Sequence, residues 1–294
     1  MSGGANSGLG ITHDPERAPS RPHEIGMIRK ILIAHDLSRR SSMALVRAGQ
    51  LASQTGAVLE ILHLVEADLP DWVIQRRELE ARTVIGDDVA TLPKSAPLRI
   101  ETNVLAGRDY TDILARAERS AADLIVLAVH REDALRTLVI GTTAERVIGF
   151  GSQPVLIVRN PAVGAYRRLV AAIDFTPSAQ RAAAFALDLL LPESEIRLVH
   201  VAAVSGAVER PQSRETNMME RIRSELGART AASVQAVVRH GPPVAIIRAE
   251  VQESQADLLV VGAQRRSGLT RALVGEIPED LLARPPCDVL VVHA

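Results

Sequence analysis

The sequence predicts an α/β protein built from two similar halves, each an open five-stranded parallel sheet with helices on both faces. Three observations predict it. Short apolar runs alternate with amphipathic stretches along the chain. Several segments recur at a fixed interval. Aromatic residues make up only 2% of the chain, so Ala, Val, Leu and Ile must build the cores, as is typical of buried parallel sheets.

The recurrence identifies a tandem duplication. Three segments return 134 residues later: "AADLIVLAVH" as "QADLLVVGAQ", "IGTTAERVI" as "VGEIPEDLL", and "QPVLIVR" as "CDVLVVH". "KILIAHDLS" and "RLVAAIDFT" match at an interval of 138 residues. We therefore expect a disordered tail over residues 1–26, a first domain over 27–160 and a second over 165–294.

Apolar runs place the strands of the first half, with helices between them. The stretch Ser41–Ala52 carries Ala44, Leu45 and Ala48 on one face, as a helix lying on a sheet requires. The expected strands are Arg29–His35, Val58–Val65, Leu98–Leu105, Leu124–Val129 and Val155–Val158.

The second half repeats this pattern, and its expected strands are Leu169–Ile173, Ile196–Ala202, Ser233–Arg239, Leu258–Val261 and Val289–Val292. The two final strands are apolar and would aggregate if exposed. We expect them to pair and to join the halves, with Val155 and Ile157 on one face and Leu156 on the other.

Composition excludes several classes of protein. The 34 basic and 35 acidic side chains balance, so neither nucleic acid nor a membrane surface is an expected partner. No apolar run approaches the ~20 residues of a membrane-spanning helix. The polar start of the chain lacks the apolar core of a signal peptide, and Cys287 is the single cysteine. A cytoplasmic location is the expectation.

Four features shared by the halves carry a family likeness. An Asp closes the first strand (Asp36, Asp174), a His lies in the second (His63, His200), "ADLIV"/"ADLLV" follows a glycine-led third helix, and a glycine-led fourth helix precedes the last strand. With these features the chain resembles a tandem universal stress protein. The resemblance implies a flavodoxin-like sheet in the order 3-2-1-4-5, a pseudo-dimer of the halves, a role in stress adaptation and, in some members, ATP binding.

The ATP-binding members carry Gly, two residues, Gly, nine residues, then Gly-Ser/Thr after the fourth strand. In the first half these places fall on Ala128, Arg131, Gly141 and Thr142; in the second they fall on Gly262, Arg265, Gly275 and Glu276. Neither motif is intact. Because Glu276 would repel a phosphate, we expect no ATP in the second half.

The first half is the better candidate for an adenine nucleotide. Gly141, Thr142 and Thr143 offer donors at a helix N-terminus, and Asp36 could bond a base at the topological switch point. Arg131 either forbids a turn with positive φ or adds a cation for phosphate. The candidate residues are Ala34, Asp36, Leu127, Ala128, Arg131, Gly141, Thr142 and Thr143. However, Thr142 and Glu145 also fit a capping box that needs no ligand, and both interpretations stay open.

Other side chains fit structural roles. His35, Asp36 and His130 could form a metal or acid/base site, but their spacing matches no known signature, so we predict neither metal ligands nor catalytic residues. His63 and His200 are expected to pack as structural residues with one ring nitrogen hydrogen-bonded, and Cys287 is expected to be a small buried residue. The segment that begins at Trp72 is expected to be a solvated helix, and the arginines after each fourth strand to lie in exposed loops.

Three functions remain from the sequence. The leading hypothesis is a non-catalytic regulator of stress adaptation that acts through a protein partner, and a homodimer is a further expectation. A slow nucleotide phosphohydrolase is the second, although the sequence contains no intact P-loop or base–nucleophile pair. A ligand-free interaction module is the third.

Overall fold

The computed structural model describes residues 28–93, 97–132, 137–139, 142–202, 212–263 and 276–293. The tail at 1–26 lies outside these ranges. The first half contains β1 Lys30–Ala34, α1 Arg39–Thr55, β2 Val58–Glu66, α2 Asp71–Ala90, β3 Arg99–Gly107, α3 Tyr110–Arg119, β4 Leu124–Ala128, β5 His130–Glu132, β6 Thr137–Val139, α4 Thr142–Phe150 and β7 Val155–Val158.

The second half repeats the main elements with few changes. It contains β8 Tyr166–Ala172, α5 Pro177–Ala186, a single 3₁₀ turn Leu187–Leu189, β9 Leu190–Ala202, α6 Gln212–Gly227, β10 Ser233–His240, α7 Pro243–Glu253, β11 Leu258–Ala263, α8 Glu276–Ala283 and β12 Asp288–His293. After the fourth strand of the first half, β5 and β6 pair as an antiparallel hairpin that the sequence did not predict, and the expected exposure of the arginines in this segment is not tested.

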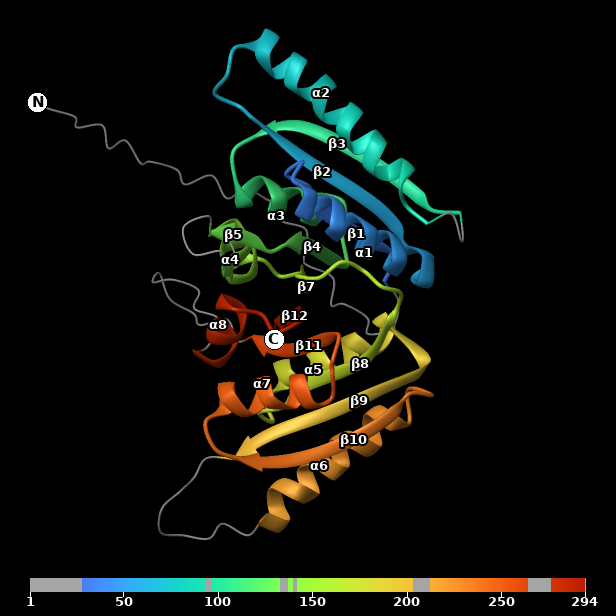
Figure 1. Cartoon of the computed structure of the whole chain (residues 1–294), viewed down its shortest axis with the longest axis vertical. Coiled ribbons are helices and arrows are strands. Elements are labelled where there is room, and N and C mark those ends of the chain that lie inside the picture. The colour runs from blue at the N-terminus through green and yellow to red at the C-terminus, as the bar shows by residue number, and fades with distance from the viewer. Residues whose placement is uncertain are drawn as a thin grey trace, which may run out of the picture.

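The ten main strands form one sheet in the order β10-β9-β8-β11-β12-β7-β4-β1-β2-β3. Each half has the order 3-2-1-4-5, and its strands are parallel. The final strands β7 and β12 are antiparallel neighbours, with Ile157 opposite Val289 and Val155 opposite Val291. The halves are therefore not two separate sheets, because they share one undivided sheet that runs the length of the molecule (Figure 1).

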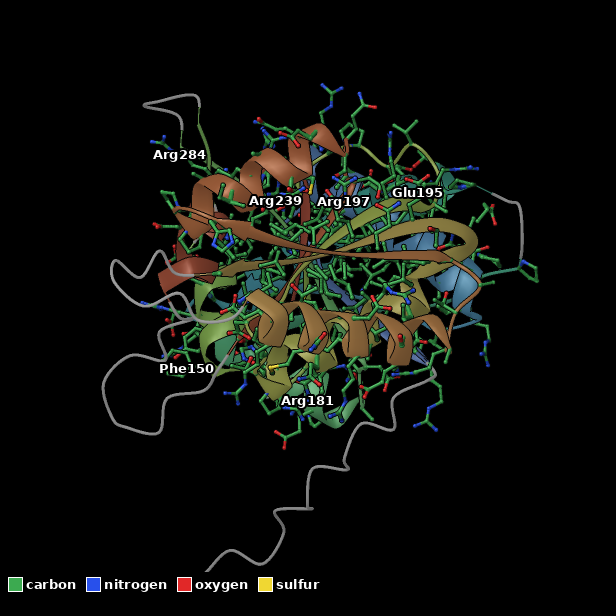
Figure 2. The ribbon with its side chains drawn as sticks, turned by 90° about the horizontal axis from the view of Figure 1, so that it is seen from below. Phe150, Arg181, Glu195, Arg197, Arg239 and Arg284 are labelled. Carbon is green, nitrogen blue, oxygen red and sulfur yellow. The ribbon has the colours of Figure 1, made fainter. Side chains whose placement is uncertain are left out.

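Helices cover both faces of this sheet and enclose two apolar layers (Figure 2). One layer packs under α1, α2, α5 and α6, and the other under α3, α4, α7 and α8. Leu156 lies in the first layer, while Val155 and Ile157 lie in the second, as strand alternation predicts. Since both layers contain residues of both halves, the halves share their cores.

A duplicated aspartate explains the "ADL" signature. Asp123 accepts hydrogen bonds from the backbone N–H groups of Arg29 and Lys30, at 2.8 and 3.0 Å. Asp257 does the same for Arg167 and Arg168, at 2.9 and 3.2 Å. In each half the carboxylate ties the start of the fourth strand to the start of the first.

Among the described residues, each half has one buried glutamate that forms ion pairs. It lies on a strand in the first half and on a helix in the second. In the first half Glu60 of β2 pairs with Arg116 of α3. In the second half the glutamate is Glu250 of α7, which pairs with Arg197 of β9 and Arg239 of β10. Figure 2 labels the two arginines, which lie side by side. The equivalent helices α3 and α7 are thus both joined to the sheet by ion pairs, but the helix carries the positive partner in the first half and the negative partner in the second.

Helix α2 lies at the outer end of the sheet (Figure 1). Only Ala81 and Ile85 are buried in it, and Trp72 is 67% exposed, as expected for a solvated helix. Among the helices that the structure describes, none is long and apolar enough to cross a membrane.

Candidate functional site

The candidate site is the crevice beyond the carboxyl ends of β1 and β4. These strands are parallel neighbours, with Ile33 beside Val126. The helices of the first two crossovers, α1 and α2, pack on one face of the sheet, and α3 and α4 pack on the other. The chain therefore leaves adjacent strand ends in opposite directions, which opens the kind of crevice where α/β proteins bind ligands.

The turn from β1 into α1 brings Asp36 to this crevice. Asp36 is exposed, and its Oδ1 accepts hydrogen bonds from Ser38 N–H at 2.9 Å and from Ser41 Oγ at 2.5 Å. Ser38 caps α1 by accepting from Ser41 N–H at 3.2 Å. The sequence "DLS" thus folds as a closed turn that fixes the carboxylate.

The hydrogen bonds of this turn favour the ionised form of the Asp36 carboxyl group. Partial desolvation raises the pKa of Asp36, but the hydrogen bonds from Ser38 and Ser41 lower it more, and the net shift is downward from its usual value. The carboxylate therefore stays ionised at neutral pH. It can accept a hydrogen bond from an amino group of a ligand.

The structure brings together some of the predicted site residues. Ala34 and Ala128 are half-buried at the ends of neighbouring strands, beside the Asp36 turn, and Thr143 is exposed on the first turn of α4. The Leu127 side chain is 5% exposed and lies in the apolar layer under α3 and α4, so a role of this residue in ligand binding stays a prediction.

Three other predicted positions are only partly described. Arg131 lies in β5 and Thr142 begins α4. Gly141 lies outside the described residues, as do Gly275, Arg136 and the arginines 265, 266 and 271. Because the residue before α4 is not described, the capping-box interpretation of Thr142 and Glu145 is not tested.

At the equivalent place in the second half, the backbone at the N-terminus of α5 lies directly against β11. A Cβ on Gly262 of β11 would lie 2.6 Å from the carbonyl carbon of Ser178 and 2.7 Å from Cα of Ala179, at the N-terminus of α5. Ala128 carries that Cβ in the first half, so α1 must stand farther from its strand. Helix α8 begins at Glu276, where α4 begins at Thr142, which places a carboxylate residue at that helix N-terminus.

This close approach gives a test of the packing. We expect Gly262→Ala to lower the free energy of unfolding by about 1–3 kcal/mol, because backbone must move to admit the methyl group. Gly86→Ala, in an exposed turn of α2 with open space around it, is the control and should raise stability by about 0.5–1 kcal/mol. Urea unfolding followed by circular dichroism measures both; equal effects would contradict the contact.

The two histidines of the second strands have matching structural roles. His63 Nδ1 bonds the carbonyl of His35 at 2.7 Å, and His200 Nδ1 bonds the carbonyl of Ile173 at 2.7 Å. In both halves the imidazole thus secures the end of the first strand. Cys287 is 3% exposed, and burial raises the pKa of its thiol, so it acts as a small core residue, as predicted.

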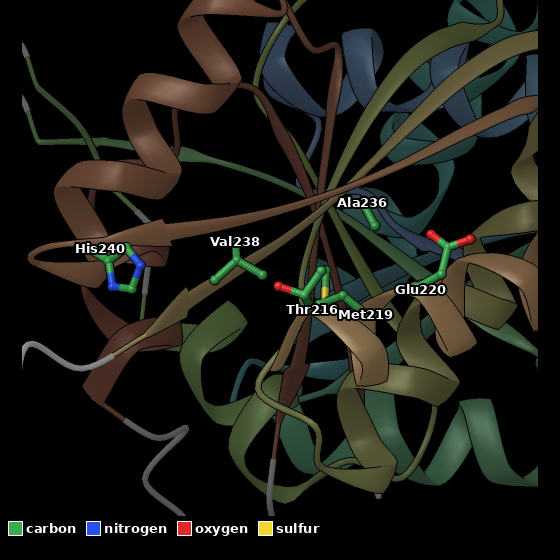
Figure 3. Close-up of a pocket in the computed structure, with 6 residues that line it drawn as sticks. All are labelled: Thr216, Met219, Glu220, Ala236, Val238 and His240. Atoms are coloured by element: carbon green, nitrogen blue, oxygen red, sulfur yellow. The ribbon is translucent and has the colours of Figure 1, made fainter. Parts of the chain in front are cut away.

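A second hollow, of about 300 Å³, lies between α6 and β10 at the far end of the sheet (Figure 3). It is lined by Thr216, Met219, Glu220, Ala236, Val238 and His240. The Glu220 carboxylate is engaged by the Arg223 guanidinium, and His240 is exposed. None of the residues predicted from the sequence lies there, and the lining offers no convergent set of buried polar groups.

The sequence did not predict two groups of contacts between polar residues. Asp88 of α2 reaches His35, with 3.3 Å between Oδ2 and Nε2. Arg47 of α1 stacks on the Tyr166 ring, 4.0 Å from its centroid, and pairs with Asp288 of β12 at 3.4 Å. Both contacts join residues far apart in the chain, and neither has a counterpart in the other half that self-comparison could detect.

The fold defines a duplicated, doubly wound α/β protein. The profile of the universal stress protein family matches residues 27–159 and again 165–293. The chain belongs to the universal stress protein family.

Relatives support this assignment. A universal stress protein of Methanocaldococcus jannaschii is 29% identical over 143 residues, which cover 46% of this chain and 84% of that protein. A universal stress protein of Thermus aquaticus is 29% identical over 140 residues, 45% of this chain and all of that protein. Each relative therefore corresponds to about one half of the chain.

Solved structures show the same fold over both halves. A universal stress protein from Archaeoglobus fulgidus superposes with a TM-score of 0.73 at 20% identity, covering 90% of this chain and 98% of that one. A protein of unknown function from Pseudomonas aeruginosa superposes with a TM-score of 0.68 at 19% identity, covering 90% and 92%. At these identities the likeness concerns the fold alone.

Proposed function

We propose that the first half binds an adenine nucleotide, with ATP as the leading candidate, in the crevice beyond β1 and β4, and that the protein acts as a non-catalytic regulator of stress adaptation. The observation that carries this proposal is the fixed, ionised carboxylate of Asp36 at the topological switch point. An adenine amino group donates hydrogen bonds, which a carboxylate accepts.

The N-terminus of α4 and Arg131 are the groups proposed to bind the phosphates. Helix α4 begins at Thr142 beside the end of β4, and a helix N-terminus attracts anions through its free N–H groups and its dipole. Arg131 lies in β5, which comes between β4 and α4 along the chain, and we propose that its positive charge contributes to phosphate binding. The second half has a glutamate at the start of α8, and the backbone at the N-terminus of α5 packs closely against Gly262 there; both features support binding in the first half only.

The duplication provides a matched test. Asp36→Asn keeps an oxygen that can accept from Ser38 and Ser41 but removes the charge, and Asp174→Asn makes the same change in the second half, where Asp174 accepts from Thr176. We expect calorimetric titration of the whole chain with ATP to show binding that Asp36→Asn weakens by about 10–100-fold. Asp174→Asn should leave it unchanged.

Other outcomes would overturn the proposal. Equal weakening by both variants would place the nucleotide elsewhere, and the absence of heat with ATP and ADP would favour a ligand-free interaction module. Steady release of phosphate from ATP would favour the phosphohydrolase. A protein partner, a homodimer and a cytoplasmic location stay predictions of the same proposal.

A further inference from the structure

The turn that carries Asp36 occurs in both halves, but only the first copy contains an imidazole. Leu37 and Phe175, at equivalent places, both have a φ of 63°, a left-handed conformation that side chains disfavour. The residue at the start of the turn is His35 in the first half and Ile173 in the second. The same backbone is thus held in two different ways.

In the first half the His35 ring holds the turn. Its side chain is fully buried, and the Leu37 N–H group donates to its Nδ1 at 3.1 Å. In the second half the Phe175 ring packs instead on the His200 ring, with 4.2 Å between centroids. Leu37 keeps its unfavourable conformation through a hydrogen bond, and Phe175 through an aromatic contact.

The partners of His35 define its protonation state. An Nδ1 that accepts a hydrogen bond carries no proton, so the neutral ring has its proton on Nε2. Nε2 lies 3.3 Å from Oδ2 of Asp88, which also accepts from Ser42 Oγ at 2.8 Å. The neutral tautomer with its proton on Nε2 therefore accepts the Leu37 hydrogen bond at Nδ1 and places its N–H group close to the Asp88 carboxylate, although the geometry there does not meet that of a hydrogen bond.

We propose that His35 is a positioning residue for the nucleotide crevice: in its neutral form it holds the Leu37 amide and thereby the Asp36 turn, and protonation at Nδ1 releases the turn and weakens nucleotide binding. This inference rests on the proposed function of the first half. A protonated Nδ1 is a donor facing the Leu37 N–H donor, so the hydrogen bond is lost. The turn then loses the contact that stabilises its left-handed residue, one position from Asp36.

Burial and the neighbouring charged groups determine in which direction the pKa of His35 is shifted. Burial lowers the pKa of His35 below its usual 6.5; the carboxylates of Asp88 on α2 and Asp36 in the turn raise it less, and His63 on β2 lowers it. His35 is therefore neutral in the folded protein at neutral pH. Unfolded chains protonate it near its usual pKa, so stability is full above that value and declines as the pH falls toward the folded value.

The test compares the wild-type chain with His35→Asn. Asparagine keeps an acceptor near the place of Nδ1 but does not titrate. Because the pKa of His35 in the folded protein lies below 6.5, we expect ATP affinity in the wild type to be constant near neutral pH and to fall progressively in more acidic buffer, by less than about tenfold at about pH 5.5. His35→Asn should bind as the wild type does at the higher pH and lose most of this fall. Titration of ATP itself affects both proteins and cancels in the comparison.

Nuclear magnetic resonance of the ligand-free chain separates this inference from the proposed function. The His35 ring should show its proton on Nε2, and the Leu37 amide signal should titrate together with the ring in the wild type and not in His35→Asn. A proton on Nδ1, or equal pH dependence in both proteins, would overturn the inference. If neither protein binds ATP while the Leu37 signal titrates as expected, the proposed function fails and the role of His35 in the turn stands.

Discussion

Asp288→Ala should lower the free energy of unfolding by about 3–5 kcal/mol, because it leaves a buried arginine without its partner. Asp288 is 1% exposed and lies at the start of β12. Its Oδ2 accepts from Tyr166 Oη at 2.7 Å and pairs with Arg47 Nε at 3.4 Å. Its Oδ1 accepts from the backbone N–H groups of Arg159 and Asn160, at 2.8 and 3.1 Å.

The variant removes the centre of a cluster that joins the halves. Arg47 belongs to α1 of the first half and is 5% exposed, and its guanidinium also donates to the Gly164 carbonyl at 2.6 Å in the connecting segment. Without Asp288 this charge stays buried, and two backbone N–H groups lose their acceptor. Unsatisfied groups of this kind account for the largest effects of single substitutions.

Urea unfolding measures the effect, with Asp280→Ala as the control. Asp280 is an exposed acidic residue on α8, and its loss should change stability by less than ~0.5 kcal/mol. Arg47→Met in the Asp288→Ala background removes the stranded charge. The double variant should therefore be more stable than the sum of the two single losses predicts, by about 1 kcal/mol or more. Strict additivity would show that the two residues do not interact.

This cluster also shows where sequence comparison fails. The repeat predicts the ten main strands because each copy has the same apolar spacing, and two copies of one pattern support each other. The residues at the equivalent places of Arg47, Tyr166 and Asp288 are Phe185, Ile28 and Pro154. Because none of the three residues is repeated in the other half, a comparison of the two halves cannot detect this cluster.

The sequence predicts part of the candidate site, but not the contacts that depend on how the helices pack. Asp36 and the carboxyl ends of β1 and β4 follow from the strand pattern and the sheet order that the family resemblance implies. The role of Asp88 does not, since it comes from an outer helix and reaches His35 only through the packing of α2. The β5–β6 hairpin was missed because "HRED" and "TLV" are too short and too polar to show strand alternation.

Ile157→Glu should unfold both halves of the protein together. Ile157 is fully buried in β7, between Leu127 of β4 and Val289 of β12. A carboxylate there loses its hydration without a partner, and the cost, with the lost apolar contact, should exceed ~4 kcal/mol. Because β7 is the strand that joins the halves, the damage should cross from the first half into the second.

Hydrogen exchange of the full chain, followed by mass spectrometry, distinguishes shared from local damage. We expect faster exchange in β1 and β4 and also in β11 and β12, whereas Thr102→Glu, on the exposed edge strand β3, should leave both regions protected. Ile157→Val should cost only about 0.5–1.5 kcal/mol, since it keeps the apolar contact. Faster exchange confined to the first half would mean that β7 and β12 pair without coupling the stability of the two copies.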